Sequence, residues 1–205
     1  LRELGVLISS GQLHKMLVEG HELFHQEKQD ILLAGLSVSS YVQADDTGSR
    51  HNEKNGFTTV VCNNLFTVFE STESKSRVNF LEVLLGRQKC YRIGIESLEY
   101  LKRQNLAPFQ LKKLELGVFF PTPELWAEYL KQIGIESPLH VRLVTEAALM
   151  GALLATEINP ALVILSDDAG QFNIFKHALC WVHAERLIKK LEPINPAYAS
   201  EQEQV

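Results

Sequence analysis

Cysteines and long apolar runs are both scarce in this chain. Its three cysteines are far apart and odd in number, which argues against a disulfide framework and favours a reducing compartment. No apolar run reaches the length of a transmembrane helix, and no signal peptide is visible. We therefore expect a cytoplasmic protein in which Cys62 and Cys90 are structural thiols.

The chain also lacks a surplus of positive charge, because its formal net charge is -5 at pH 7. This composition excludes a strongly basic nucleic-acid binder, so affinity for DNA needs a local basic face, a bound metal or other parts of a longer protein. The chain begins without methionine and ends in the polar segment 200–205, and we expect it to be a fragment. A hydrophobic content of 45% is enough for the core of one large domain, or of a domain with a subdomain.

Hydrophobic periodicity divides the chain into helical and extended segments. Residues 1–36 read as helical, either as a plain helical hairpin or as a remnant of a DNA-reading helix-turn-helix. Strands are expected over residues 41–45, 57–62, 65–70, 161–165 and 178–182. Helices are expected over residues 74–85, 95–103, 108–114, 123–133, 141–156 and 185–191. This order predicts four regions: a helical lead-in (1–36), the first half of a sheet domain (37–86), a helical insertion (87–158) and the second half of the sheet domain (159–205).

Two acidic pairs, Asp45-Asp46 and Asp167-Asp168, each follow a short apolar run. A carboxylate at the tip of a buried strand is costly unless it has a function, and two neighbouring carboxylates suit a divalent metal ion. The order of elements fits an α/β fold of the ribonuclease-H-like (retroviral-integrase-like) class, whose mixed sheet places the first strand beside the fourth. Both pairs would then meet at one edge, where two metal ions about 3.5–4 Å apart bind the attacking and leaving oxygens of a phosphoryl transfer. The alternative is that the first pair starts a turn and the second caps a helix.

The sequence around these pairs resembles that of a known family. Three segments carry the resemblance: residues 44–48 (Ala-Asp-Asp-Thr-Gly), residues 166–172 (Ser-Asp-Asp-Ala-Gly-Gln-Phe) and residues 177–186, which contain a Cys-Trp-x-His-x-x-Arg stretch. They are similar to the aspartate segments of DDE transposases of bacterial insertion sequences, and most similar to the insertion-sequence sixty-six family. Residues 4–13 also resemble the segment upstream of that family's catalytic domain. The resemblance covers most of the chain and is weak through residues 87–158.

The resemblance implies a catalytic core in which Asp45 and Asp167 are the catalytic residues and hold two Mg²⁺ or Mn²⁺ ions. Adjacent strand residues face opposite sides, so Asp46 and Asp168 are expected beside the site and not as ligands of the same ion. The resemblance further implies cleavage and strand transfer of DNA at transposon ends, a DNA target, a homo-oligomer and no membrane contact. The location it implies is a bacterial cytoplasm, in association with the nucleoid.

Two departures from the family bear on activity. The family's third acidic ligand is a glutamate on a downstream helix, in a stretch rich in Asn, Ser and Glu, and neither Glu192 nor Glu201 lies in such a stretch. The strongly basic DNA-reading region of a transposase is also missing. We therefore expect a core truncated before the third acidic residue and inactive by itself. Two alternatives stay open: a truncated or degenerate remnant that binds DNA or self-associates without catalysis, and a stand-alone ribonuclease-H-like nuclease.

Further candidate residues lie near the acidic pairs. His177, Cys180 and His183 have a three-residue spacing that suits Zn²⁺, although their apolar neighbours favour a buried strand. In the functional interpretation His183 contacts a phosphate or orients a carboxylate beside the metals, and in the structural one it is a satisfied core histidine. Five side chains near the first three strands are candidates for contact with DNA phosphates, or else are plain solvated surface: Arg50, His51, Lys54, Lys75 and Arg77.

Overall fold

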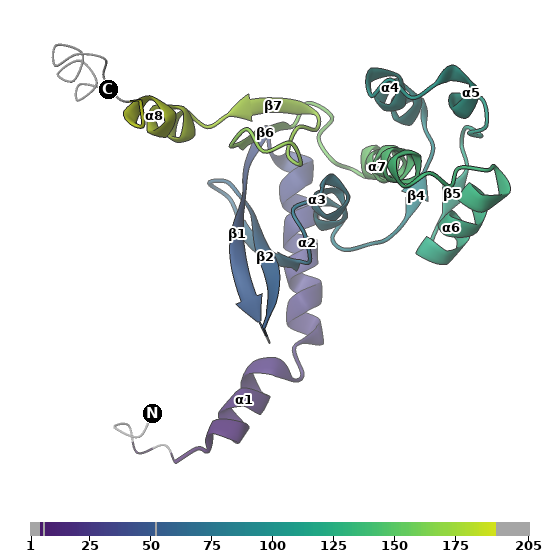
Figure 1. Ribbon diagram of the computed structural model, residues 1–205. Coiled ribbons are helices and arrows are strands. Elements are labelled where there is room, and N and C mark those ends of the chain that lie inside the picture. Colours follow the sequence, from purple (N-terminus) through teal and green to yellow (C-terminus); the bar gives the residue numbers. More distant parts are fainter. Residues whose placement is uncertain (1–4, 6, 52, 192–205) are drawn as a thin grey trace, which may run out of the picture.

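A computed structural model describes residue 5, residues 7–51 and residues 53–191 (Figure 1). Its helices are α1 (Ser10–Val18), α2 (Glu22–Val38), α3 (Arg77–Leu84), α4 (Ile95–Arg103), α5 (Pro108–Leu111), α6 (Pro123–Gln132), α7 (Pro138–Leu154) and α8 (Trp181–Lys189). Its strands are β1 (Tyr41–His51), β2 (Lys54–Cys62), β3 (Thr67–Thr72), β4 (Tyr91–Arg92), β5 (Phe119–Phe120), β6 (Val163–Ser166) and β7 (Lys176–Leu179). Across these residues, no helix combines enough length with enough apolar character to span a bilayer.

Five of the strands form one mixed sheet in the order β3-β2-β1-β6-β7. The neighbours β1, β2 and β3 are antiparallel, whereas β6 runs parallel to β1 and β7 runs parallel to β6. The ladder between β1 and β6 joins distant parts of the chain and pairs Gln43 with Leu165. The expected α/β architecture is thus confirmed, and the first strand lies beside the strand that follows residue 160.

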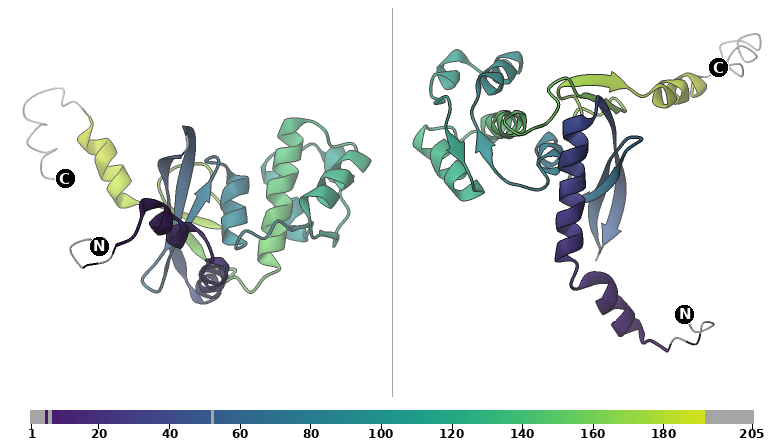
Figure 2. Two further views of the ribbon diagram at one scale, coloured as in Figure 1. Left: turned by 90° about the horizontal axis from the view of Figure 1, so that it is seen from below. Right: turned by 180° about the vertical axis from the view of Figure 1, so that it is seen from behind.

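The two faces of the sheet differ, because successive side chains along a strand point to opposite sides. On one face, called the covered face here, Val42 and Ala44 of β1 and Ile164 of β6 are buried. Helices α2 and α3 pack over this face, and Figure 2 shows α2 running alongside the strands. On the opposite, open face, Phe69 of β3 is 60% exposed and Tyr41 of β1 is 37% exposed. Neighbouring residues of β1 therefore meet different surroundings.

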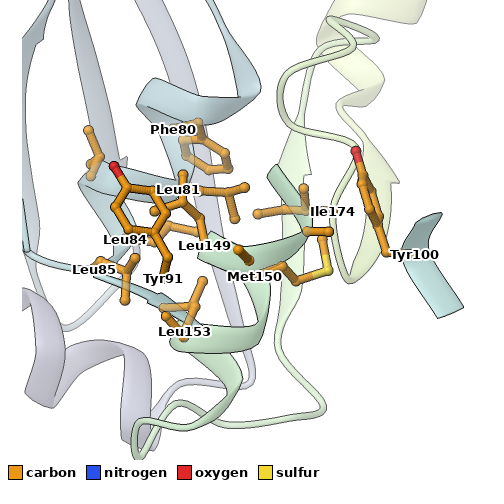
Figure 3. Packing of buried hydrophobic residues seen from close by; sticks show 14 of the residues in the cluster. Phe80, Leu81, Leu84, Leu85, Tyr91, Tyr100, Leu149, Met150, Leu153 and Ile174 are labelled. Carbon is orange, nitrogen blue, oxygen red and sulfur yellow. The ribbon is translucent and has the colours of Figure 1, made fainter. Parts of the chain in front are cut away.

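The helical insertion joins the same core through α7. This helix lies against α3, and Figure 3 shows Leu81 of α3 close to Leu149 of α7. Residues on nearly every side of α7 are buried, as its continuous apolar sequence predicts for an internal helix. The short antiparallel ladder between β4 and β5 was not predicted from the sequence.

The first acidic pair does not start a turn. Strand β1 continues to His51, well past the pair, and Asp45 and Asp46 lie opposite Val60 and Thr59 in the antiparallel ladder with β2. The physical reason is that β2 begins earlier than its apolar run suggests, so it supplies backbone partners to the polar half of β1. The turn interpretation of this pair is therefore wrong.

The strand expected over residues 178–182 is also partly wrong. Strand β7 ends at Leu179, and Cys180 is the N-cap residue of α8, with its N–H donating to the Ser166 carbonyl at 2.7 Å. Trp181 is 73% exposed, so it does not lie in a buried strand. A short apolar run fits either a strand or the first turn of an amphipathic helix, and the helical spacing that continues to Lys189 decides for the helix.

Candidate functional site

The two acidic pairs, Asp45-Asp46 and Asp167-Asp168, form what we call the acidic edge. The ladder between β1 and β6 aligns Gln43 with Leu165, so the two pairs follow at the same level, each beginning two residues beyond the last ladder residue of its segment. Neighbouring strands in a sheet lie about 4.8 Å apart. The parallel register therefore places the two acidic pairs side by side.

Within the first pair, the structure gives the two carboxylates different surroundings. Asp46 lies on the covered face, where its Oδ2 accepts a hydrogen bond from Gln171 Nε2 at 3.0 Å and its Oδ1 accepts one from the Thr59 hydroxyl. Asp45 is exposed on the other side of the strand, and its Oδ1 accepts the Asp46 N–H at 2.8 Å. Asp46 is thus held by protein groups, and Asp45 is accessible to a ligand. Gln171 and Thr59 were not among the site residues predicted from the sequence, although Gln171 lies inside the second aspartate segment.

The second pair begins the loop between β6 and β7. Asp167 is half-buried, and its Oδ1 accepts the N–H of Ala169 at 3.1 Å, whereas Asp168 is exposed. This short-range hydrogen bond is that of an aspartate-stabilised turn and not of a helix cap. A carboxylate accepts several bonds, so Asp167 can also bind a metal or a water.

The proposed zinc ligands are not brought together. His177 Nε2 lies 2.8 Å from the hydroxyl of Ser166, and that hydroxyl donates to the Asp167 carbonyl at 2.7 Å. The Nε2 atom of His177 is therefore already engaged by the Ser166 hydroxyl. Among the described residues, no group of three or more His, Cys, Asp and Glu side chains could hold a metal ion. The geometry therefore does not support zinc at His177, Cys180 and His183.

A cleft of about 460 Å³ opens beside the second pair, between its loop and α8. Asp167 and Asp168 line it together with His183, Arg186 and Lys190. Within the part of the chain that the structure describes, His183 Nδ1 is buried without a hydrogen-bond partner. A cleft with basic side chains next to carboxylates suits a phosphate that shares a metal with them. Arg186 and Lys190 were missed as candidates, although Arg186 is the arginine of the Cys-Trp-x-His-x-x-Arg stretch.

The donor set fits a magnesium site only in part. Mg²⁺ is commonly held by one or two carboxylates while waters and substrate phosphates supply its remaining ligands. Asp45 and Asp167 satisfy that minimum, because the register of the neighbouring strands β1 and β6 places Asp45, within β1, at the level of Asp167, just past the end of β6. In the described ranges no third acidic side chain completes a cluster with them. Glu192 and Glu201 lie outside the described residues.

The basic candidates around the first three strands divide into two groups. Arg50 and Lys75 are exposed, and Lys75 Nζ donates to the Asp46 carbonyl at 3.2 Å, which places this ammonium group at the acidic edge. Arg77 turns inward, with a side chain that is 17% exposed and lies 3.5 Å from Glu146. A guanidinium that neutralises a buried carboxylate is not presented to an external phosphate. The side chains of His51 and Lys54 lie outside what the structure describes.

The hydroxyl of Tyr100 donates a hydrogen bond to Glu146 at 2.6 Å. We expect this buried tyrosine to lower the free energy of unfolding at high pH. Burial, then the hydrogen bond and charge of Glu146, raise the pKa of Tyr100 from 10.0 to about 12, against an opposing effect of Arg77. The unfolded chain therefore releases this proton at lower pH than the folded chain, so the stability that the shift contributes is full below pH 10 and is lost towards pH 12. We expect denaturant titrations across this window to show a shallower decline of the unfolding free energy in Tyr100→Phe. An equal decline in both chains would contradict the prediction.

Comparison with known proteins gives one similar chain. The uncharacterized protein y4jO of Sinorhizobium fredii (strain NBRC 101917 / NGR234) is 38% identical over 179 residues. The match takes in 85% of this chain and 56% of y4jO, so this chain spans little more than half of that protein's length. No known protein family matches the chain, and no solved structure matches it.

Proposed function

We propose that this chain is the catalytic-core part of a DDE transposase with a ribonuclease-H-like fold, and that the complete protein cleaves and joins DNA at transposon ends. The observation that carries the proposal is the β1–β6 register, which puts Asp45 of β1 at the level of Asp167, just past the end of β6. The strand order β3-β2-β1-β6-β7, with three antiparallel strands first, supports the fold. The resemblance of residues 44–48, 166–172 and 177–186 to the family's aspartate segments supports the reaction.

In this proposal the described residues have separate tasks. Asp45 and Asp167 hold the metal, and bound Mg²⁺ would activate the attacking hydroxyl and neutralise charge on the phosphate. Asp46 is engaged by Gln171 and Thr59, so it holds β1 in place and leaves ligation to its neighbour. The rate enhancement then comes from positioning and charge neutralisation, and no protein nucleophile is needed.

The phosphates of DNA would be bound on both sides of the acidic edge. Lys75 lies next to Asp46 on one side, and Arg186 and Lys190 line the cleft next to Asp167 on the other. Contacts of this kind position a nucleic acid without reading its sequence. They also supply the local basic groups that a chain of net charge -5 needs in order to approach DNA.

A non-catalytic remnant is the second candidate. It is favoured because the described part of the chain offers two metal-binding carboxylates at the acidic edge and no cluster of three. Such a chain would bind DNA or self-associate without cleaving a phosphodiester.

Binding of Mn²⁺ tests the metal site that the transposase and a stand-alone ribonuclease-H-like nuclease both require. We expect calorimetry to detect Mn²⁺ binding to the unmodified chain, and Asp45→Asn or Asp167→Asn to weaken it at least about tenfold, because each removes a ligand. Asp168→Asn is the matched control, since it removes the same charge from an exposed neighbour. Absence of Mn²⁺ binding would contradict the proposal, and an equal effect of Asp168→Asn would contradict the assignment of Asp45 and Asp167.

Cleavage of supercoiled DNA in Mn²⁺ by the complete protein separates the candidates, because the core without its third acidic ligand is expected to be inactive by itself. Nicking that Asp45→Asn abolishes supports a catalytic core, and strand joining in addition supports a transposase over a stand-alone nuclease. Mn²⁺ binding without any nicking supports the remnant.

A further inference from the structure

Arg77 connects the acidic edge with the helical insertion. It is the first residue of α3, and its Nη2 donates to the carbonyl oxygen of Gly170, in the loop between β6 and β7. Its Nη1 donates to the Tyr100 hydroxyl of α4 at 2.8 Å and lies 3.5 Å from Glu146 Oε2 of α7. One side chain therefore joins α3, α4, α7 and the loop that begins with the second acidic pair.

Glu146 fixes the direction of the Arg77 side chain. Glu146 is 4% exposed, and its Oε2 accepts a hydrogen bond from the Tyr100 hydroxyl at 2.6 Å. A buried carboxylate is strongly destabilising when its partner charge is removed. Arg142 also approaches Glu146, at 3.8 Å, but its side chain is 59% exposed. Arg77 is thus the buried partner, and the need to neutralise Glu146 keeps it in place.

The loop carries this constraint to β1. Gly170, which Arg77 holds, is followed by Gln171, whose Nε2 donates to Asp46 Oδ2 at 3.0 Å. The next residue, Phe172, packs edge-on against Phe80 of α3 with ring centroids 4.9 Å apart. Helix α3 therefore holds the loop on both sides of Gln171, and Gln171 reaches the first acidic pair.

We propose that Arg77 is a positioning residue, through which α4 and α7 set the place of the loop relative to the acidic residues of β1. The helical insertion is then part of what forms the acidic edge, and not an appendage to the sheet. The positioning stands on the contacts of Arg77, Glu146 and Gly170, whereas its consequence for a metal ion rests on the proposed function.

Hydrogen exchange in Arg77→Lys tests the positioning directly. The N–H groups of Ala169 and Phe172 report on the loop, because they donate to Asp167 Oδ1 and to the Ala169 carbonyl. Lysine keeps the charge but cannot hold Gly170 and Tyr100 with two separate nitrogens, so we expect both amides to exchange at least about tenfold faster. The matched control is Arg87→Lys, because Arg87 also pairs with a glutamate, Glu70 at 3.3 Å, and donates to a backbone carbonyl outside this loop.

Unchanged exchange in Arg77→Lys, or an equal increase in Arg87→Lys, would overturn the positioning role. If Arg77→Lys does not fold, Tyr100→Phe is the milder variant, since it removes one anchor of Arg77 and keeps every charge. It is expected to speed loop exchange several-fold, and unchanged exchange would overturn the proposal in the same way.

Mn²⁺ binding is then measured on the same proteins. A weakening of about tenfold in Arg77→Lys, but not in Arg87→Lys, extends the role of Arg77 to the metal site. If loop exchange rises in Arg77→Lys but the unmodified chain binds no Mn²⁺, the proposed function is contradicted and the positioning role of Arg77 is retained.

Discussion

Replacing Gly151 with alanine is expected to lower the free energy of unfolding by about 3 kcal/mol, because α7 approaches the start of α4 too closely for any side chain. A β-carbon at Gly151 would overlap the carbonyl oxygen of Arg92 and the hydroxyl of Ser97. That hydroxyl donates to the Ala147 carbonyl at 2.8 Å, so moving it also breaks a buried hydrogen bond. Alanine gains about 1 kcal/mol of helix propensity over glycine, which reduces the loss but does not reverse it. Urea denaturation followed by circular dichroism measures the change.

Gly11→Ala is the control for this substitution. Gly11 is also helical, in α1, but no atom lies within 4 Å of a β-carbon built there. We expect Gly11→Ala to raise the unfolding free energy by up to about 1 kcal/mol, because alanine gains helix propensity there without a clash. Equal stabilities of the two variants would show that α7 does not approach Arg92 and Ser97 as described. The close packing of α7 against the start of α4 would then be contradicted.

The local part of this fold could be predicted from the sequence, because it is encoded in local patterns. The expected helix over residues 95–103 has the bounds of α4, where apolar spacing and the glycine at its start agree. Strands β4 and β5 could not be predicted, since two residues each are too few to show an alternation. The prediction of a strand through Cys180 failed for a related reason. Its apolar residues suit a strand and a helix equally, and the hydrogen bonds that the Cys180 carbonyl accepts from the N–H groups of His183 and Ala184 begin α8 there.

The acidic edge was predictable in outline and not in detail. The apolar runs before Asp45 and Asp167 identify two strands, and the order of elements makes them neighbours, although β1 continues past Asp45 to His51. Strand alternation puts Asp46 on the same face as Val42 and Ala44, but its hydrogen-bond partner Gln171 lies far away along the chain and was not predictable. The inward direction of Arg77 depends in the same way on the buried Glu146. Long-range polar contacts of this kind leave no periodic signal, so an exposed arginine and a buried one look alike in the sequence.

Phe172→Ala is expected to be the most destabilising change at the loop, with a loss of about 3–5 kcal/mol of unfolding free energy. Phe172 is 1% exposed and packs edge-on against Phe80, so truncation leaves a cavity under the loop. Phe69→Ala is the matched control, because Phe69 is 60% exposed on the open face of the sheet, and its truncation should cost less than about 1 kcal/mol. Urea denaturation of both variants makes the comparison, and a loss in Phe172→Ala no larger than in Phe69→Ala would contradict the buried position.

The same variant separates the stability of the loop from its function. Phe172 and Arg77 hold the residues on either side of Gln171, so Phe172→Ala frees one side of the loop while the Arg77 contact to Gly170 stays. If anchoring on both sides is needed to keep Gln171 on Asp46, the folded fraction of Phe172→Ala should bind Mn²⁺ more weakly, although no metal ligand has changed. Unchanged Mn²⁺ affinity in a chain that is less stable by several kcal/mol would mean that Arg77 alone suffices to place the loop. In that case the edge of the sheet is set by the ion pair with Glu146, and the aromatic contact contributes stability only.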